Sequence, residues 1–396
     1  MIRKISADWI IPISHNPIKN GLITVDSEGK ILEISATFDS TQPNIEYYKG
    51  VIIPGFINTH CHLELSHMKG LVPTGLGLIS FIKEVVSKRN FEIQDILNAI
   101  QLADQEMFDN GIMAVGDISN MNHTFPFKLK SKLQYYTFIE YFDMLNPSWT
   151  ERVIKQYNQV YHEAPSDGRH RRSAVPHAPY SVTPELFVAI NLLNNKQSLV
   201  SLHNEETIAE NELFMSKSGG FVDFYNTLGN ELDHFNPIGH SSIHYSLEHM
   251  DLNLRTLLVH NTTMCQEDIV FARSKLKEVY WCTCPNANMY IEGRLPEYQN
   301  FISNDCKMTV GTDSLTSNWQ LSILEELKTI EQHYPDIEVF ELLKWATLNG
   351  AKALGFDENL GSLEVGKSPG IVLLEDSIEG AHVILKNSKV KRLLYT

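Results

Sequence analysis

Residues 51–62 read Val-Ile-Ile-Pro-Gly-Phe-Ile-Asn-Thr-His60-Cys-His62, an apolar, β-branched run that ends in two histidines one residue apart. Such a run predicts a buried strand at 51–60, interrupted once by a Pro-Gly pair. Because side chains alternate along a strand, His60 and His62 point to the same face. Two imidazoles on one face can bind a single metal ion if neighbouring strands supply further ligands. The simpler alternative is two polar residues at the start of a loop. Motifs elsewhere in the chain distinguish between these two interpretations.

Strand-like and helix-like stretches alternate from this run to residue 355. The expected strands are 51–60, 112–118, 133–140, 173–177, 198–203, 256–260, 278–284 and 308–313. The expected helices are 78–89, 92–110, 150–162, 184–193, 208–218, 266–276, 321–333 and 339–354, the last ended by Gly355. Eight strands alternating with helices predict an α/β protein of the (β/α)8 TIM barrel type, whose active site lies at the carboxyl ends of the strands.

Short alternating segments at the two ends of the chain predict a second, smaller unit. Segments 4–13, 21–25 and 30–35 are separated by turn residues, and a similar texture returns only in 361–374 and 382–386. We expect the two ends to pair into one small β-sandwich with the barrel inserted between them. The predicted domains are therefore 1–52 plus 356–396 for the β-sandwich and 53–355 for the barrel.

The composition of the chain limits the classes of partner. The 396 residues carry a formal charge of −15 with histidine neutral, and no long block of like charge occurs. That balance argues against nucleic-acid or anionic-membrane binding and favours a small-molecule substrate. The N-terminus lacks the apolar stretch of a signal peptide and no run could span a bilayer, so we expect a cytoplasmic protein. The five cysteines do not form a disulfide pattern, and Cys282 and Cys284 are predicted to be buried small hydrophobic residues.

Polar residues close five of the predicted barrel strands. Strand one ends in His60 and His62, strand four in His177, strand five in His203, strand six in His260 and strand eight in Asp313. Packing could explain one buried histidine at a strand end, but so many on one rim indicate chemistry. We predict that one catalytic metal ion is bound by four of them: His60, His62, His203 and Asp313. Three imidazoles and a carboxylate suit Zn²⁺ and, as the alternative, Fe²⁺, either of which can make hydroxide available from bound water at neutral pH.

Three residues have predicted catalytic roles. Glu206 lies three residues after His203, where the chain turns from strand into helix, and is predicted to shuttle a proton from water to the leaving or ring atom. His260 is predicted to hydrogen-bond the attacking water, and Asp313 to serve also as a base for its proton. The alternative for Glu206 is an acidic residue favoured by the helix dipole, an interpretation that suits Glu205 and Glu210 well.

Residues that select the substrate are expected in the loops at the same rim, since loops vary most. The proline-bracketed segment 176–180 presents one histidine as a substrate contact, and residues 311–318 place several hydroxyls and an amide there, some of them helix N-caps. The candidate substrate contacts are His177, Glu64, Glu140, Ser314 and Asn318. For Glu64 and Glu140 the alternative is a solvated charge at the rim.

With these motifs in place, the chain resembles the amidohydrolase superfamily, and within it the aminohydrolase, or deaminase, branch. The matching motifs are 54–62, 176–180, 203–206, 259–261, 284–288 and 311–313. The resemblance covers nearly the whole chain, including the split β-sandwich that the family carries. The resemblance implies a mononuclear site, because the strand-four region offers no lysine where binuclear relatives carry a carboxylated one. It places the family's acid/base glutamate on Glu206, its strand-six histidine on His260 and its strand-eight aspartate on Asp313.

The resemblance also implies a reaction. The usual chemistry of this branch is hydrolytic deamination, in which metal-bound hydroxide adds to an amidine carbon of a heterocycle and ammonia leaves. Residues 62–66 and 311–326 are most similar to the aminodeoxyfutalosine deaminases, and the loop around His177 is similar to the adenosylhomocysteine and methylthioadenosine deaminases. Both groups imply a 6-aminopurine nucleoside, such as aminodeoxyfutalosine or a related adenosine derivative, and the family resemblance makes a homodimer plausible. Ser314 and the pair Asn204-Glu205 depart from the patterns of these groups, which bears on the substrate more than on the reaction.

Two other functions stay open at this point. One keeps the enzyme but changes the bond, giving a chlorohydrolase or a cyclic amide hydrolase that releases chloride or a ring-opened acid. The other is a non-catalytic metal-binding sensor. The joint presence of Glu206, His260 and Asp313 weighs against the sensor.

Overall fold

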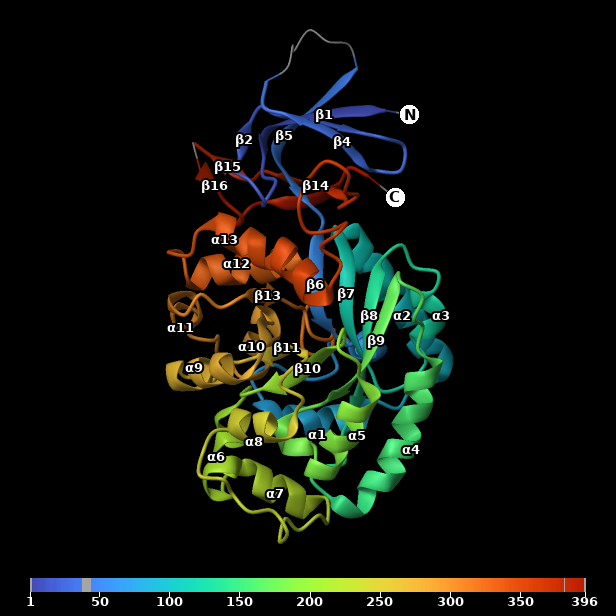
Figure 1. The fold of residues 1–396 in the computed structure, drawn as a ribbon, viewed down its shortest axis with the longest axis vertical. Coiled ribbons are helices and arrows are strands. Elements are labelled where there is room, and N and C mark those ends of the chain that lie inside the picture. The colour runs from blue at the N-terminus through green and yellow to red at the C-terminus, as the bar shows by residue number, and fades with distance from the viewer. Residues whose placement is uncertain (1, 38–43, 381, 395–396) are drawn as a thin grey trace.

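The chain folds into a large α/β body and a smaller β unit that contains both chain ends (Figure 1). The computed structural model describes residues 2–37, 44–380 and 382–394. The predicted fold class, a (β/α)8 barrel with a small β-sandwich made from both ends, is confirmed. No described helix is both long enough and apolar enough to cross a membrane.

Eight parallel strands of the described chain form the barrel, in two four-stranded sheets. The first sheet contains β6 (Phe56–Cys61), β7 (Ile112–Ser119), β8 (Gln134–Tyr141) and β9 (His170–Pro176). The second contains β10 (Leu199–Asn204), β11 (Arg255–His260), β12 (Glu278–Thr283) and β13 (Met308–Val310). All eight were predicted, and most of their residues are buried because helices cover the strands from outside.

Two seams join these sheets into a closed barrel. Between β9 and β10, the backbone N–H of His203 donates to the carbonyl oxygen of His177 at 2.9 Å. Between β13 and β6, the backbone N–H of Thr312 donates to the carbonyl oxygen of His60 at 3.0 Å. Predicted metal ligands therefore lie at both seams, and closure of the barrel itself brings them together.

The predicted strand 51–60 is in fact two strands that meet at Gly55. Its first half ends β5 (Ile45–Pro54), which pairs with β14 (Ile371–Glu375) in the terminal sheet, whereas β6 begins after Gly55 and pairs with β7. Gly55 is required at the crossing, because a Cβ there would lie 2.2 Å from Cγ of Met113. The sequence did not separate the two halves because both are apolar and β-branched.

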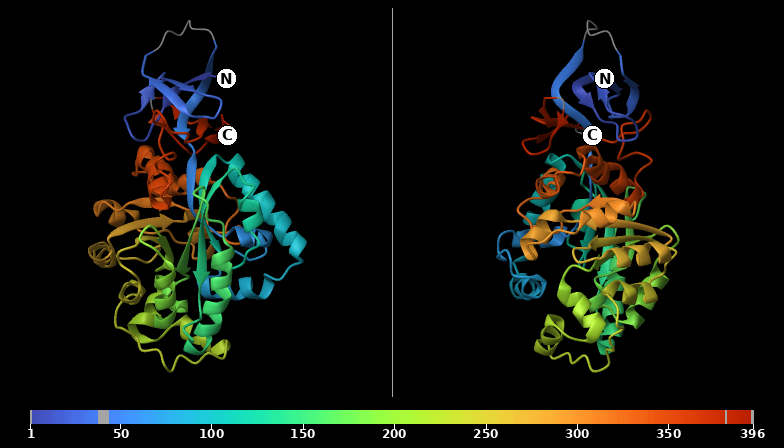
Figure 2. Two further views of the ribbon diagram at one scale, coloured as in Figure 1. Left: turned by 45° about the vertical axis from the view of Figure 1, so that its right-hand side comes forward. Right: turned by 90° about the vertical axis from the view of Figure 1, so that its left-hand side faces the viewer.

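Helices surround the barrel strands (Figure 2). Those predicted are α1 (Leu78–Lys88), α2 (Ile93–Asp109), α4 (Pro147–Glu163), α5 (Pro184–Leu193), α6 (Ile208–Ser216), α9 (Gln266–Lys275), α12 (Ile323–His333), and a composite of α13 (Val339–Lys344), a π turn (Trp345–Asn349) and α14 (Gly350–Leu354). Those not predicted are α3 (Phe125–Lys128), α7 (Gly220–Thr227), α8 (Ser242–His249), α10 (Pro285–Ile291) and α11 (Tyr298–Ser303). They are too short to show a helical period in the sequence.

Local sequence signals explain where several helices begin and end. The side chain of Asn146 accepts the backbone N–H of Ser148 and caps α4, and that of Thr183 caps α5 through the N–H of Leu186. Both α4 and α5 begin with a proline, which has no backbone N–H that could be left unpaired at the start of the helix. The composite helix ends at Gly355, whose φ of 74° favours glycine.

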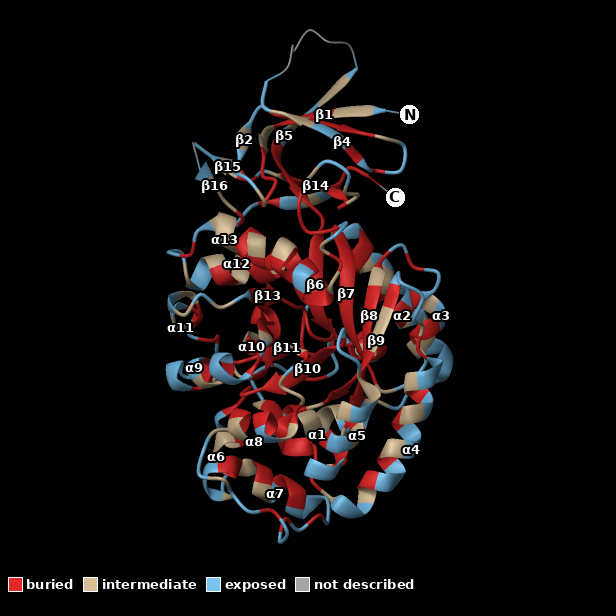
Figure 3. Ribbon diagram, in the orientation of Figure 1, coloured by how far each residue is buried: buried red, intermediate tan, exposed pale blue. Residues whose placement is uncertain are grey.

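The terminal unit contains a seven-stranded sheet of described residues, in the order β17-β14-β5-β1-β3-β4 with β2 on β1. Its other strands are β1 (Arg3–Ile10), β2 (Ile18–Lys19), β3 (Leu22–Val25), β4 (Ile31–Ser35) and β17 (Lys389–Arg392), and β15 (Ile378–Glu379) pairs separately with β16 (His382–Val383). Ile5, Ile52 and Leu373 belong to its own core cluster. Figure 3 shows the much larger barrel core in red. The domain boundaries 52/53 and 355/356 stay a prediction.

Candidate active site

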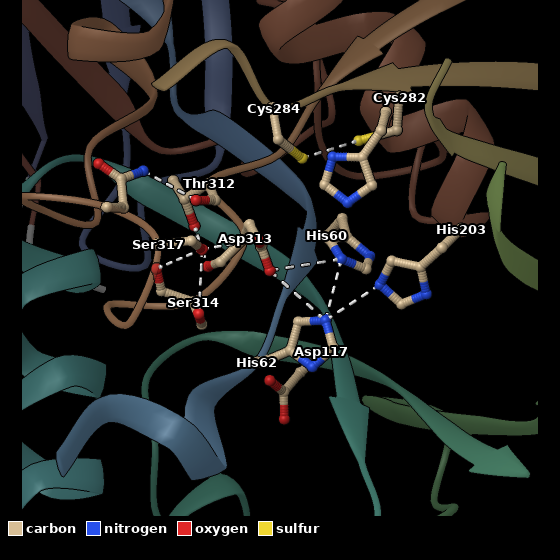
Figure 4. A network of polar contacts seen from close by, with 12 residues as sticks. His60, His62, Asp117, His203, Cys282, Cys284, Thr312, Asp313, Ser314 and Ser317 are labelled. Atoms are coloured by element: carbon tan, nitrogen blue, oxygen red, sulfur yellow. Dashed lines mark hydrogen bonds and ion pairs between the residues drawn. The ribbon is translucent and has the colours of Figure 1, made fainter. Parts of the chain in front are cut away.

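The four predicted metal ligands meet at the carboxyl ends of β6, β10 and β13 (Figure 4). Nε2 of His62 lies 3.2 Å from Nε2 of both His60 and His203. Oδ1 of Asp313 lies 3.5 Å from Nε2 of His62 and 3.8 Å from Nε2 of His60. All four side chains are buried. The fold thus brings residues that are more than 250 positions apart in the sequence to one point.

These atoms fit a divalent metal ion. Nδ1–H of His203 donates to the carbonyl oxygen of His177 at 2.7 Å, so its Nε2 carries the lone pair that faces the other imidazoles. Burial, and then the neighbouring imidazoles, lower the pKa of His60 and His203 well below the usual range, so both rings are neutral. A cation placed among these nitrogen atoms would be bound by their lone pairs. Neutral imidazoles with a carboxylate are a donor set for Zn²⁺ or Fe²⁺.

The side chain of Asp313 is held in place by its own loop. The hydroxyl of Ser317 donates to Oδ2 at 2.7 Å, which leaves Oδ1 facing the imidazoles. The backbone of Asp313 has a φ of 54°, and its N–H donates to the carbonyl oxygen of His60 at 3.1 Å. A non-glycine residue in this region stores strain of about 1–3 kcal/mol, which such surrounding contacts maintain.

Glu206 and His260 lie beside this group. Nδ1–H of His260 donates to Oδ1 of Asn288 at 2.8 Å, and Nε2 lies 3.8 Å from Oε2 of Glu206. The carboxylate of Glu210 accepts the backbone N–H groups of Glu205 and Glu206, at 3.0 and 3.1 Å, and so holds the turn. Burial, and then the charge of a neighbouring aspartate, raise the pKa of Glu206 well above its usual range. This carboxyl can therefore hold a proton at neutral pH, as a general acid must.

The site opens into a cavity at this end of the barrel. His62, His203, Glu206, His260 and Asp313 line one part of it. Leu78, Phe81, Ile82 and Val85 of α1 form an apolar wall. This wall was not predicted, because the apolar period of α1 is the same for a helix that faces a cavity and for one that packs on a core.

Three predicted substrate contacts line the cavity: His177, Glu140 and Ser314. Nδ1–H of His177 donates to Oε1 of Glu140 at 2.8 Å, and Asn120, which was not predicted, donates through Nδ2 to Oε2 at 3.1 Å. Burial raises the pKa of Glu140, but the charge and hydrogen bond of His177 outweigh it, so the pKa lies below the usual range. Glu140 is 2% exposed and is therefore no solvated rim charge.

Glu64 and Asn318 are buried, but they do not line this cavity. Oε2 of Glu64 accepts two backbone N–H groups that follow β7, at 3.0 and 3.1 Å. Nδ2 of Asn318 donates to the carbonyl oxygen of Thr312 at 2.8 Å and to Oε1 of Glu326 at 2.7 Å. Both side chains hold loops in this structure, and a contact with substrate stays a prediction for them.

A second group of possible metal ligands, Glu140, His177 and His203, has its atoms within reach of one ion. Its hydrogen bonds argue against that use. Nδ1 of His203 and Nδ1 of His177 both carry protons, which they donate to a carbonyl oxygen at 2.7 Å and to Glu140 at 2.8 Å. The group therefore orients the candidate ligand His203 from the side opposite its Nε2, an arrangement that is common around metal-binding histidines.

A buried ion pair between Asp117 on β7 and Lys128 on α3 supports the turn after His62, and it was not predicted from the sequence. Nζ of Lys128 lies 2.6 Å from Oδ2 of Asp117, and both side chains are fully buried. Oδ1 of Asp117 accepts the backbone N–H of Leu63 at 2.7 Å. Figure 4 shows Asp117 close to His62. The pair links α3 to the strand end that carries two predicted ligands.

Replacing Lys128 by methionine is expected to lower the free energy of unfolding by about 3–5 kcal/mol, because it leaves the Asp117 carboxylate buried and unpaired. Urea denaturation measures the change. The matched control is Lys328→Met, which breaks a partly exposed pair with Glu325 at 2.7 Å and is expected to cost about 0–1 kcal/mol. Equal losses of unfolding free energy in the two variants would show that burial does not increase the contribution of the Lys128–Asp117 pair to stability.

Fold and site together define a barrel hydrolase with a histidine-rich centre at the carboxyl ends of its strands. The chain belongs to the amidohydrolase family, whose model matches residues 51–393. The resemblance predicted from the motifs is thus confirmed, and the protein is a hydrolase of this family.

Individual relatives agree with this assignment. The chain is 29% identical to an adenosine deaminase of Helicobacter pylori over 349 residues, covering 85% of this chain and 83% of that protein. It superposes on the crystal structure of Helicobacter pylori aminofutalosine deaminase in complex with methylthio-coformycin with a TM-score of 0.81, at 24% identity, covering 98% and 97% of the two chains. An adenosine deaminase from Xanthomonas campestris with bound zinc matches with a TM-score of 0.76, at 19% identity, covering 98% and 91%. At these identities the structural matches show the shared fold.

Proposed function

We propose that the protein is a metal-dependent deaminase that hydrolyses the 6-amino group of an adenosine derivative. The observation that carries this proposal is the position of Glu206, a carboxyl able to hold a proton, in the same cavity as three of the four candidate ligands, His62, His203 and Asp313. A sensor would need the ligands but no proton carrier. The relatives named adenosine and aminofutalosine deaminases support the purine nucleoside as substrate.

One divalent ion, Zn²⁺ first and Fe²⁺ as the alternative, is proposed to be held by His60, His62, His203 and Asp313. The zinc bound in the similar Xanthomonas campestris protein supports this choice. When bound, such an ion lowers the pKa of a water ligand toward neutrality and so supplies a nucleophile at pH 7.

The side chains of this chain are proposed to position the water and move its protons. Nε2 of His260 is free to accept a hydrogen bond from the attacking water, because Nδ1 holds the proton that it donates to Asn288. Glu206 takes one proton from the attacking water and transfers it to the ring nitrogen beside the carbon under attack. Asp313 accepts the remaining hydroxyl proton and passes it to the amino group, which leaves as ammonia. The products are a 6-oxopurine nucleoside and ammonia.

The cavity also supports a choice among adenosine derivatives. The apolar side chains of α1 can cover an apolar substituent on the ribose, and burying such a group contributes roughly 25 cal/mol per Å². His177, Glu140 and Ser314 are proposed as the polar contacts. The expected homodimer and cytoplasmic location stay predictions.

Ammonia release from a substrate panel tests the proposed function. The panel contains adenosine, 5′-deoxyadenosine, methylthioadenosine, guanine, cytosine and a chlorotriazine, each assayed with Zn²⁺-loaded and Fe²⁺-loaded enzyme. We expect ammonia from the adenosine derivatives alone, with the lowest KM for those with an apolar 5′ substituent. Chloride or a ring-opened acid would replace the proposal by the other hydrolases, and silence across the panel with metal bound would favour the sensor.

A further inference from the structure

Glu326 on α12 is a fully buried carboxyl that the proposed chemistry does not use. Its Oε2 accepts the backbone N–H of Asn286 at 2.8 Å, and its Oε1 accepts the side-chain N–H groups of Asn286 at 3.0 Å and Asn318 at 2.7 Å. Asn286 follows β12 and Asn318 follows β13. One carboxyl therefore joins the start of α10 to the loop after β13, at the end of the barrel where the candidate ligands meet.

Helix α10 connects this carboxyl to His260. Asn286 and Asn288 lie two residues apart on α10, so their side chains leave the helix on different sides. Asn286 faces α12, and Oδ1 of Asn288 accepts the Nδ1–H of His260 at 2.8 Å. Nδ2 of Asn288 is buried and has no hydrogen-bond partner among the described residues. The side chain of Asn288 thus has no second hydrogen bond to hold it, and its position depends on the placement of α10.

We propose that Glu326 is a positioning residue that fixes α10 through Asn286, so that Asn288 keeps the imidazole of His260 oriented toward the cavity. Glu326 touches neither His260 nor the cavity, and it acts only through the helix. The catalytic consequence rests on the role of His260 in the proposed function. The geometric claim concerns one hydrogen bond and can be measured without any substrate.

Glu326→Gln is the variant that tests this arrangement. Glutamine keeps the size of the side chain but replaces one acceptor oxygen by an NH₂ group, so at least one buried N–H of the two asparagines loses its acceptor. Burial raises the pKa of Glu326 to about 8, so the assays are run at pH 9, where the wild-type carboxyl is charged. We expect kcat to fall by about 10²-fold with little change in KM, because the imidazole is misplaced and the substrate cavity is not.

The second readout is the Nδ1–H resonance of His260 in protein with ¹⁵N-labelled histidine, assigned by its absence from a His260→Gln variant. In the wild type this proton is buried and hydrogen-bonded, so it should exchange slowly. Glu326→Gln should shift the resonance and speed its exchange. This measurement separates the two claims, because it decides the positioning role even if no tested nucleoside releases ammonia.

Glu325→Gln is the matched control, one residue earlier on α12, where the side chain is partly exposed and pairs with Lys328 at 2.7 Å. It should leave both kcat and the resonance unchanged.

A double-mutant cycle tests whether the two residues act together. Glu326→Gln combined with Asn288→Ala should lower kcat little more than Asn288→Ala alone, because both act on one hydrogen bond. If Glu326→Gln gives no folded protein, Asn286→Ala takes its place in the same measurements. The proposal would be overturned if the losses of kcat in Glu326→Gln and Asn288→Ala were independent of each other in the cycle. It would also be overturned if Glu326→Gln changed Tm but left kcat and the resonance as they are in Glu325→Gln.

Discussion

Replacing Glu206 by glutamine is expected to lower kcat for deamination by about 10²–10⁴-fold, the range typical of a lost general acid or base. Glutamine has nearly the same size, so the cavity and the substrate should still fit and KM should change little. It cannot carry a proton from water to the ring, although it still lies beside Nε2 of His260. Steady-state ammonia release by metal-loaded enzyme measures the effect.

Glu205→Gln is the control for this experiment. Glu205 is also buried, but it does not line the cavity, and its Oε2 accepts an N–H of Asn211 at 3.2 Å. Its replacement should change kcat by only a few-fold. Unchanged turnover in Glu206→Gln would assign the proton transfer to another residue, and equal losses in both variants would indicate damage to the turn that Glu210 holds.

His62→Ala is expected to abolish both metal binding and turnover, because His62 is the central imidazole of the candidate site. Its Nε2 lies 3.2 Å from each of the other two Nε2 atoms and 3.5 Å from Asp313. Without it, two imidazoles and a carboxylate remain, one fewer than the predicted four ligands. We expect about one metal ion per wild-type chain and nearly none in the variant, measured by elemental analysis.

His67→Ala is the matched control, five residues along the chain. Its Nε2 lies 3.1 Å from the carbonyl oxygen of Arg89, outside the metal cluster, so metal content and kcat should stay as in the wild type. In parallel, chelation should remove wild-type activity, and added Zn²⁺ or Fe²⁺ should restore it. A full metal content with normal turnover in His62→Ala would contradict the ligand set.

The barrel and the candidate ligands were predictable because each depends on a local rule. Alternation along a strand puts His60 and His62 on one face, and the barrel rule puts strand ends on one rim, so His203 and Asp313 could be assigned to the same site. The structure brings these four together. Their roles as ligands stay a prediction until metal content is measured.

The supporting contacts could not be predicted in the same way, because they join elements that are distant in the sequence. Nothing near Lys128 indicates that its ammonium is buried against Asp117. Likewise, Glu326 looks like an ordinary acidic residue in the first turn of a helix, and only the packing of α12 against α10 places it under Asn286. The crossing at Gly55 was missed because the signal there, an apolar run, is shared by both strands.

Hydrolysis in H₂¹⁸O of the best nucleoside from the panel tests the central claim most directly. The account predicts a 6-oxopurine nucleoside that carries one ¹⁸O from solvent, one ammonia released per product, and an intact ribose with its substituent. Product formation should require the metal ion and should fall in step with metal content in His62→Ala. A product that keeps its amino group, or that has lost the base or the ribose substituent, would contradict a deaminase.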